Sequence, residues 1–138
     1  MNNKKLLQKM SNLNQNTMAT AVGLELTEIG DDYVCGKIPV DHRTVQPYGL
    51  LHGGASVALA ETLGSLAGSM QVNPQKEMVV GVEINANHLK SVKEGWVYGK
   101  ASPINIGNKI QVWEILITDE GNKLVCISRL TLAVVKIR

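Results

Sequence analysis

Phenylalanine is absent from this chain of 138 residues, which has only two tryptophans and three tyrosines. A hydrophobic core must therefore be built mainly from aliphatic side chains. Cysteine is also scarce, since only Cys35 and Cys126 are present, far apart and without C-x-x-C spacing. We expect both to be reduced, buried thiols and not a disulfide or a metal-binding pair. The three histidines, His42, His52 and His88, have no metal-ligand spacing either, so no metal site is predicted.

An excess of charge of one sign is missing too. The chain has 14 basic and 12 acidic residues, for a net charge of +2. This balance argues against a nucleic-acid binder, which usually carries a basic stripe. No apolar stretch follows Lys4 and Lys5 as it would in a secretory signal, and Glu61 interrupts the longest apolar run before it could span a membrane. We therefore expect a cytoplasmic protein with no nucleic-acid or membrane partner.

The length fits one compact domain, and no linker or repeat divides the chain. Residues 1–16 are polar, but their leucines and methionine recur at helical spacing, which predicts an N-terminal extension with a short helix. Residues 17–138 form the predicted domain, which begins with a second short helix over residues 17–22. The one long helix candidate covers residues 52–72, where a following Asn-Pro pair ends the pattern.

Six segments have the apolar alternation and the flanking turn residues of β-strands. They span residues 24–29, 33–40, 78–89, 96–103, 109–119 and 124–137. The helix candidate is rich in glycine, which costs up to about 1 kcal/mol per residue relative to alanine. A lone surface helix would hardly tolerate that cost, so this helix should be packed inside other structure. The sequence predicts an α+β domain with a six-stranded, mainly antiparallel sheet and one central helix.

Glu61 is the only charged residue between His52 and Val72. Burying a bare charge is prohibitive, so this carboxylate must be solvated, paired or functional. In apolar surroundings it would suit a general base. A solvent-facing or ion-paired glutamate is the alternative, and Glu61 alone does not decide between them. Ser65, four residues later on the same helix face, could orient a water beside Glu61 or be one more small residue of a close-packed helix.

Gly53 and Gly54 stand where the predicted helix begins. Backbone N–H groups at a helix N-terminus favour negative charge, so these residues could polarise a carbonyl, although a tight turn would also explain them. Glu61 follows Gly53 by eight residues, or about 12 Å along a helix. One carbonyl cannot reach both. If Gly53 and Glu61 serve one reaction centre, they belong to different chains of a two-fold dimer with shared active sites.

The segment Gln46-Pro-Tyr-Gly-Leu-Leu-His52-Gly-Gly-Ala-Ser-Val-Ala-Leu-Ala-Glu61 resembles the signature of hotdog-fold acyl-CoA thioesterases. The likeness is to the phenylacetic-acid and 4-hydroxybenzoyl-CoA (Arthrobacter-type) thioesterase group, close to 1,4-dihydroxy-2-naphthoyl-CoA hydrolase, and it extends over about residues 17–138. It implies a sheet wrapped around the long helix, and homodimers that pair into a homotetramer. It also implies hydrolysis of an acyl-CoA thioester to free CoA and a carboxylic acid, with an aromatic acyl group as in menaquinone biosynthesis. No cofactor is implied, because coenzyme A is part of the substrate.

The resemblance also implies roles for individual residues. Glu61 matches the catalytic carboxylate, as nucleophile or general base, and Gly53 matches the N–H that polarises the thioester carbonyl. Gln46 and His52 match residues that line the carbonyl and the helix start, and Ser65 matches one that positions the glutamate or a water. Coenzyme A contacts are implied at Gly81, at His88, Leu89, Lys90 and Ser91, and at Asn105, Ile106, Gly107, Asn108, Lys109 and Ile110. Lys90 and Lys109 are the expected phosphate partners, although each could also be a solvated lysine in a turn.

Other functions have to be weighed against a thioesterase. Residues 54–58 half-match the G-x-S-x-G motif of serine hydrolases, but they end in alanine and follow a loop instead of a strand, which disfavours that class. A non-catalytic acyl-CoA-binding hotdog module is the main alternative, although a binder does not need Glu61. A hotdog dehydratase acting on acyl-carrier substrates would need a histidine-containing loop of its own ahead of the helix, which is not seen.

Overall fold

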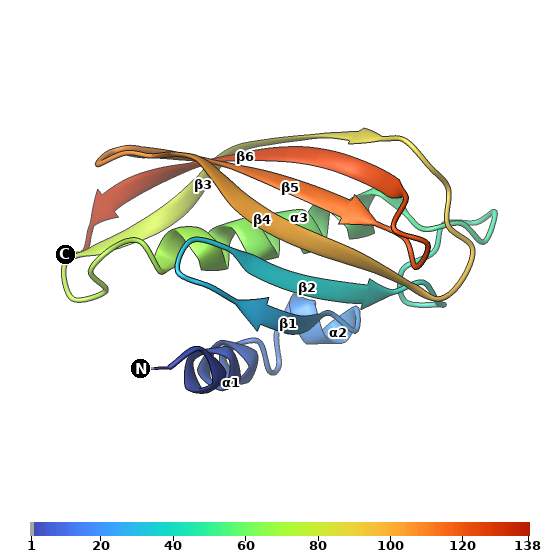
Figure 1. Ribbon diagram of the computed structural model, residues 1–138, viewed down its shortest axis with the longest axis horizontal. Helices are drawn as coiled ribbons and strands as arrows, with labels where there is room; N and C mark the ends of the chain where they lie inside the picture. The colour runs from blue at the N-terminus through green and yellow to red at the C-terminus, as the bar shows by residue number, and fades with distance from the viewer. Residues whose placement is uncertain (1) are drawn as a thin grey trace.

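The computed structural model describes residues 2–138 (Figure 1). These residues form three helices and six strands. In chain order they are α1 (Asn3–Leu13), α2 (Met18–Ala21), β1 (Glu25–Ile29), β2 (Val34–Pro39), α3 (Gly53–Ser69), β3 (Glu77–His88), β4 (Trp96–Ile106), β5 (Ile110–Thr118) and β6 (Leu124–Lys136). The six predicted strands are confirmed, with bounds within three residues of those expected, and so are the three predicted helices.

The strands form one sheet in the order β1-β2-β4-β5-β6-β3, and every neighbouring pair is antiparallel. The chain leaves β2 near one side of the sheet, passes through α3, and enters β3 at the opposite edge. The curved sheet therefore wraps around α3, which lies along its inner face (Figure 1). The α+β fold with one central helix is confirmed.

Glycines allow α3 to lie close to the sheet. Leu63 of α3 is fully buried, and a Cβ at Gly99 of β4 would come within 2.8 Å of its Cδ1. In the other direction, a Cβ at Gly64 of α3 would lie 2.6 Å from Cδ2 of Leu130. Such distances are too short for real Cβ atoms, so each position needs glycine for the layers to meet. This close packing explains why a glycine-rich helix is stable here.

The core is aliphatic, as expected, with Trp113 as its one large aromatic side chain among residues 2–138. Its indole Nε1 donates to Oε1 of Gln111 at 2.9 Å, and Nε2 of Gln111 donates to the carbonyl of Gly68 on α3 at 3.3 Å. Gln111 is fully buried. The side-chain amide of Gln111 therefore provides a hydrogen-bond acceptor for the buried indole N–H, and its second hydrogen bond connects the last part of α3 to β5.

Three details differ from the sequence-based expectation. Helix α3 ends at Ser69, three residues early, and Met70 forms its C-cap. Strand β4 continues past Pro103 to Ile106, with a register shift between Pro103 and Asn105, as is typical after a proline that cannot donate to the ladder. Cys126 is buried as predicted, but Cys35 is only half-buried, because the alternation of β2 turns it to the outer face.

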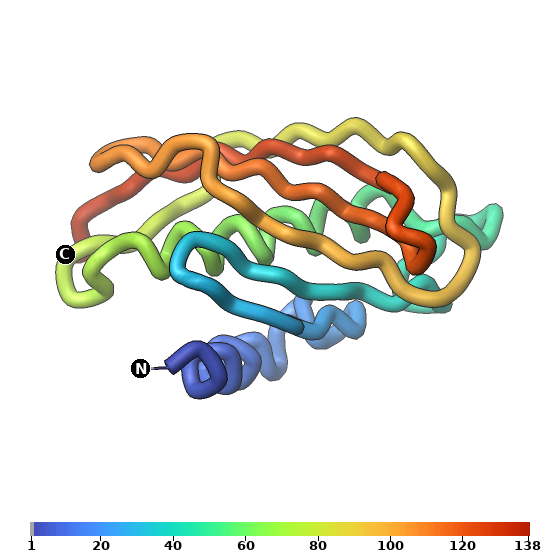
Figure 2. Tube along the Cα trace, viewed as in Figure 1, coloured from blue at the N-terminus to red at the C-terminus, as the bar shows by residue number. Residues whose placement is uncertain are grey.

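The two edges of the sheet are covered differently. Helix α1 packs along β1 below the sheet, whereas no element of residues 2–138 covers the outer edge of β3 (Figure 2). Three apolar side chains are exposed on β3, with 47% of Met78, 39% of Val80 and 60% of Val82 accessible. An open, apolar edge strand presents unpaired N–H and C=O groups to another chain.

Candidate active site

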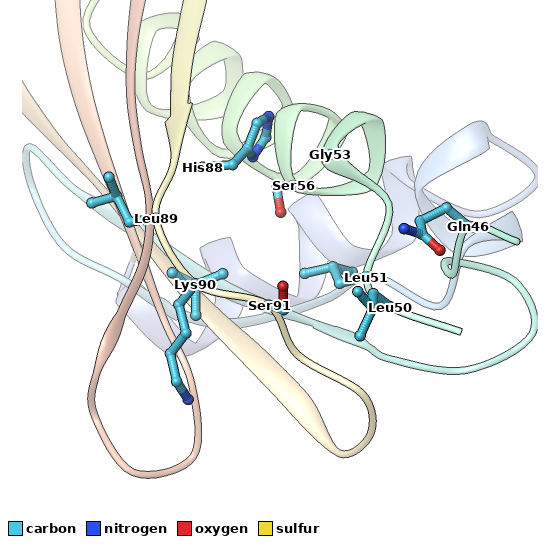
Figure 3. Close-up of a pocket in the computed structure, with 10 residues that line it drawn as sticks. Gln46, Leu50, Leu51, Gly53, Ser56, His88, Leu89, Lys90 and Ser91 are labelled. Carbon is cyan, nitrogen blue, oxygen red and sulfur yellow. The ribbon is translucent and has the colours of Figure 1, made fainter. Parts of the chain in front are cut away.

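A hollow of about 360 Å³ lies beside the first turn of α3 (Figure 3). Four parts of the chain line it: the loop before α3, the start of α3, the end of β3 with the segment that follows it, and the start of β6. The lining residues are Gln46, Leu50, Leu51, Gly53, Ser56, His88, Leu89, Lys90, Ser91 and Val125. Six of the residues predicted for catalysis or coenzyme A binding are thus brought together: Gln46, Gly53, His88, Leu89, Lys90 and Ser91.

Backbone hydrogen bonds hold the loop before α3 in place. The N–H of Leu51 donates to the carbonyl of Val92 at 2.8 Å, and the N–H of His52 donates to the carbonyl of Thr44 at 2.8 Å. At the loop start, the Arg43 guanidinium donates to Asp41 at 2.7 Å and lowers the pKa of that carboxyl to about 2. The two backbone bonds anchor the end of the loop at which α3 begins.

The first turn of α3 presents one free donor. His52 is the N-cap, and its Nδ1 accepts the N–H of Gly54 at 2.8 Å. This nitrogen carries no proton, so the proton of the neutral ring lies on Nε2. No hydrogen bond formed within residues 2–138 uses the N–H of Gly53. His52, which was predicted to line the helix start, thus occupies one donor and leaves Gly53 available to a ligand.

His88 and Gln46 lie on either side of this donor. A Cβ at Gly53 would lie 2.9 Å from Nε2 of His88, so the imidazole packs directly on the glycine. Gln46 accepts the N–H of Tyr48 through its Oε1 at 2.5 Å, which leaves its amide nitrogen turned toward the hollow (Figure 3). An imidazole, an amide and a backbone N–H therefore surround one end of the hollow.

Glu61 lies outside this hollow. It is half-buried on α3, and a Cβ at Gly81 of β3 would come within 3.0 Å of its Oε2. The register of β3 shifts between Gly81 and Glu83, so a β-bulge lies beside the carboxylate. The ion pairs among residues 2–138 are Arg43–Asp41 and Lys90–Asp119. The ion-paired alternative for Glu61 is therefore wrong within the described chain.

Lys90 is not a free surface lysine. Its ammonium is paired with Asp119 in the turn between β5 and β6, and this contact lowers the pKa of the Asp119 carboxyl. Asp119 also accepts the N–H groups of Gly121 and Lys123, each at 2.9 Å. In Figure 3 the side chain of Lys90 extends away from Gly53 toward that turn. The side chain of Lys90 is still 43% exposed, so a solvated lysine stays an alternative to a phosphate partner, and its charge lies at the rim of the hollow.

The remaining predicted site residues lie elsewhere in the subunit. Residues 105–110 form the turn from β4 to β5, where the carbonyl of Lys109 accepts the N–H of Val134 at 2.8 Å. Val134 pairs with Val79, at the other end of β3 from His88. His88 follows Val79 by nine positions along the strand, or about 30 Å, and Figure 2 shows the turn and the start of α3 at opposite ends of the molecule. One subunit does not bring the two predicted coenzyme A segments together.

Ser65 lines a second hollow, of about 380 Å³, between the C-terminal half of α3 and the start of β3. Most of its lining is apolar: Leu66, Val72, Pro74, Met78, Val79 and Ile137, together with Ser69 and Glu77. Ser65 and Glu61 are one helical turn apart on α3, as predicted. The carboxylate therefore lies close to an apolar hollow and at a distance from the free N–H of its own chain.

Comparison with known proteins places this arrangement in a family. Residues 48–126 match the family model of the thioesterase superfamily. The chain belongs to the thioesterase superfamily. A crystal structure of a thioesterase from Haemophilus influenzae is 52% identical, with a TM-score of 0.91, over 94% of this chain and 90% of that one. The thioesterase described here has the hotdog fold of this superfamily and is a thioester hydrolase, as predicted.

Two further relatives of the thioesterase are informative. The 1,4-dihydroxy-2-naphthoyl-CoA hydrolase of Escherichia coli is 46% identical over 128 residues, which is 93% of each protein. A thioesterase from Staphylococcus aureus is 34% identical and was crystallised as two variants, one with a glutamine and one with a glutamate replaced by alanine. The glutamate variant covers 87% of this chain and 99% of its own, with a TM-score of 0.84.

Within residues 2–138 of the thioesterase, no three metal-ligating side chains come together. None of the helices described is both long and apolar enough to pass through a lipid bilayer.

Sequence reasoning missed one polar residue of the first hollow. Ser56 was considered only as part of the half-matched serine hydrolase motif, yet it lies on the buried side of α3 and lines the hollow. Its spacing from Gly53, three residues along one helix face, was the signal that could have indicated it.

Proposed function

We propose that this thioesterase hydrolyses the coenzyme A ester of an aromatic acid, such as 1,4-dihydroxy-2-naphthoyl-CoA, in a site shared by two subunits. Gly53 of one subunit polarises the thioester carbonyl, and Glu61 of the other supplies the carboxylate. The coenzyme A moiety and the acyl group are inferred from the activity of the Escherichia coli relative, at 46% identity. No further cofactor is needed for this reaction.

One observation carries the proposal. Helix α3 runs without a break from Gly53 to Ser69, so Gly53 and Glu61 are held about 12 Å apart along its axis. The hollow beside Gly53 contains Gln46 but not Glu61. Gln46 and Glu61 are fifteen residues apart, as are the glutamine and the glutamate replaced in the Staphylococcus aureus thioesterase. A complete site therefore needs a second subunit.

The open edge of β3 supports the arrangement of that dimer. Glu61 lies beside Gly81, and Gly53 lies beside His88, so α3 and β3 run antiparallel to one another. If Glu61 is to meet Gly53 of the partner subunit, Gly81 must lie near His88 of the partner subunit. Antiparallel pairing of two β3 strands brings these residues close together when the two-fold axis passes through Asn85, which then lies opposite its own copy. Pairing of such dimers would then give the predicted homotetramer.

The same pairing completes the coenzyme A site. The turn of residues 105–110 lies near Val79, at the far end of β3 from the hollow. In the antiparallel dimer this end approaches His88 of the partner subunit. Lys109 of one subunit and Lys90 of the other would then flank one coenzyme A, whose phosphates bind lysine ammonium groups. The two predicted coenzyme A segments are therefore far apart within one subunit and come together across the interface of the proposed dimer.

The chemistry follows from the two groups. The Gly53 N–H draws charge onto the carbonyl oxygen, which makes the carbonyl carbon more electrophilic. Glu61 either adds to that carbon itself or removes a proton from the water that adds. When the C–S bond breaks, the sulfur keeps the electron pair and leaves as the coenzyme A thiolate. By the nucleophilic route, water then cleaves the resulting anhydride, so both routes end with a carboxylic acid and free CoA.

Thiol release from a panel of acyl-CoA and aryl-CoA esters tests the activity and its substrate class. We expect aromatic esters to have a higher kcat/KM than medium-chain aliphatic esters. Equal values for the two classes would contradict the aromatic assignment. If the protein binds CoA but cleaves no ester in the panel, the non-catalytic binding module is the correct function and Glu61 is not a catalytic group.

Cross-linking tests the dimer. In a background with Cys35 and Cys126 replaced by serine, we expect Asn85→Cys to give disulfide-linked dimers under mild oxidation, because two copies of this residue lie next to the proposed axis. Thr27→Cys, on β1 at the opposite edge, is the matched control and should stay monomeric on a non-reducing gel. Efficient cross-linking at Thr27, or none at Asn85, would contradict pairing through β3.

A further inference from the structure

Ser56 differs from the other buried polar residues of the protein. Thr44, Ser56, Gln111 and Ser128 are each at most 2% exposed. The hydroxyl of Thr44 donates to the carbonyl of Pro39, and the hydroxyl of Ser128 donates to a carbonyl of β3. The side-chain amide of Gln111 both donates and accepts a hydrogen bond. The hydroxyl of Ser56 has no hydrogen-bond partner among residues 2–138, although its residue is only 1% exposed.

The hollow is where this hydroxyl remains accessible. Every fully buried side-chain nitrogen or oxygen in the described residues has a hydrogen-bond partner, so the unpartnered Oγ of Ser56 retains some access. Ser56 lines the hollow beside Gly53, and in Figure 3 its oxygen points into the space between α3 and Ser91. A serine inside a helix often bonds to the carbonyl four residues earlier. That carbonyl, of His52, instead accepts the backbone N–H groups of Ala55 and Ser56.

Ser56 and Gly53 lie on the same face of α3. Three residues separate them, which is about 4.5 Å along the helix axis and close to one full turn. Side chains of a helix tilt toward its N-terminus, so the hydroxyl of Ser56 lies over the turn that contains Gly53. Two hydrogen-bond donors without a protein acceptor, one N–H and one O–H, therefore face one hollow.

We propose that Ser56 is a further catalytic residue of this thioesterase, whose Oγ–H donates a hydrogen bond to the thioester carbonyl oxygen together with the N–H of Gly53. The inference rests on the proposed function of Gly53. A carbonyl oxygen has two lone pairs and can accept both bonds. When the nucleophile adds, the π electron pair moves to this oxygen, and both donors stabilise the negative charge. Ser56 keeps its own proton throughout and is not the nucleophile.

Ser56→Ala tests this role. We expect kcat to fall about 100-fold, the loss typical for one oxyanion donor, while KM changes less than about 3-fold. The thermal unfolding midpoint should stay the same or rise, because the lost hydroxyl has no protein partner. Ser69→Ala is the matched control on the same helix, since the Ser69 hydroxyl bonds to the carbonyl of Leu66 at 2.8 Å. It should leave kcat unchanged. Ser56→Cys, with a poorer donor of similar size, should fall between wild type and Ser56→Ala.

Two results would overturn the proposal. One is wild-type kcat in folded Ser56→Ala or, if that variant does not fold, in Ser56→Cys. The other is a raised KM with unchanged kcat, which would place Ser56 on the ground-state substrate. Glu61→Gln is measured in parallel to separate this inference from the proposed function. If Glu61→Gln is inactive and Ser56→Ala is fully active, only the assignment of Ser56 is wrong. If both variants keep full activity, the reaction takes place elsewhere.

Discussion

Glu61→Gln should lower kcat by at least about 10³-fold without unfolding the protein. The amide has the shape of the carboxylate but can neither attack a thioester nor accept a proton from water. Stability should be unaffected, because Glu61 forms no ion pair within residues 2–138. The measurement is colorimetric thiol release together with thermal unfolding. Folded Glu61→Gln with more than about a tenth of wild-type kcat would contradict the role assigned to the carboxylate.

Mixing of variant subunits shows where Glu61 acts. In Gly53→Val the new side chain meets His88 and blocks the access of the substrate to the N–H of residue 53. This variant should therefore be inactive, like Glu61→Gln. A mixed dimer has one site with an intact Gly53 from the first chain and an intact Glu61 from the second. Random exchange of the two variants should restore about a quarter of wild-type activity. No recovery on mixing, with exchange shown by mass spectrometry, would contradict the shared site.

Leu63→Ala should lower the free energy of unfolding by about 4 kcal/mol, near the upper end for such a change. Leu63 is fully buried and faces glycine on two strands: Cβ atoms at Gly36 and Gly99 would each lie 2.8 Å from one of its methyl groups. Glycines have no side chains that could move into the cavity, so it should stay open. Urea unfolding at one fixed protein concentration measures the change, because the concentration of a dimer affects its apparent stability.

A second substitution provides the control for this prediction. Gly99→Ala alone should destabilise the protein, because the added methyl meets Leu63. In the Leu63→Ala background the same methyl fills part of the cavity and should stabilise by about 1 kcal/mol. The two residues are in contact, so their effects should not add. The same sign for Gly99→Ala in both backgrounds would show that the glycines are not there to make room for Leu63.

Local patterns predicted the elements well, because strands, turns and the glycine-rich helix depend on nearby residues. The position of β3 at the sheet edge depends on pairing with β6, whose partner residues lie 38 to 59 positions further along the chain, and no local pattern contains it. The site shows the same division. Gly53 and Glu61 were identified by their places on one helix. The pairing of Lys90 with Asp119, the half-exposure of Cys35 and the free hydroxyl of Ser56 depend on how distant segments pack.

The unbroken path of α3 makes the number of residues between Gly53 and Glu61 matter more than their identity. One inserted residue would turn Glu61 by about 100° around the helix axis and move it about 1.5 Å further away. Substitutions to other small residues within the stretch leave this spacing as it is. Under two-fold symmetry an insertion changes both sites of a dimer equally, so neither can compensate for the other. Functional relatives should therefore differ by substitutions in the stretch between Gly53 and Glu61, but not by insertions or deletions there.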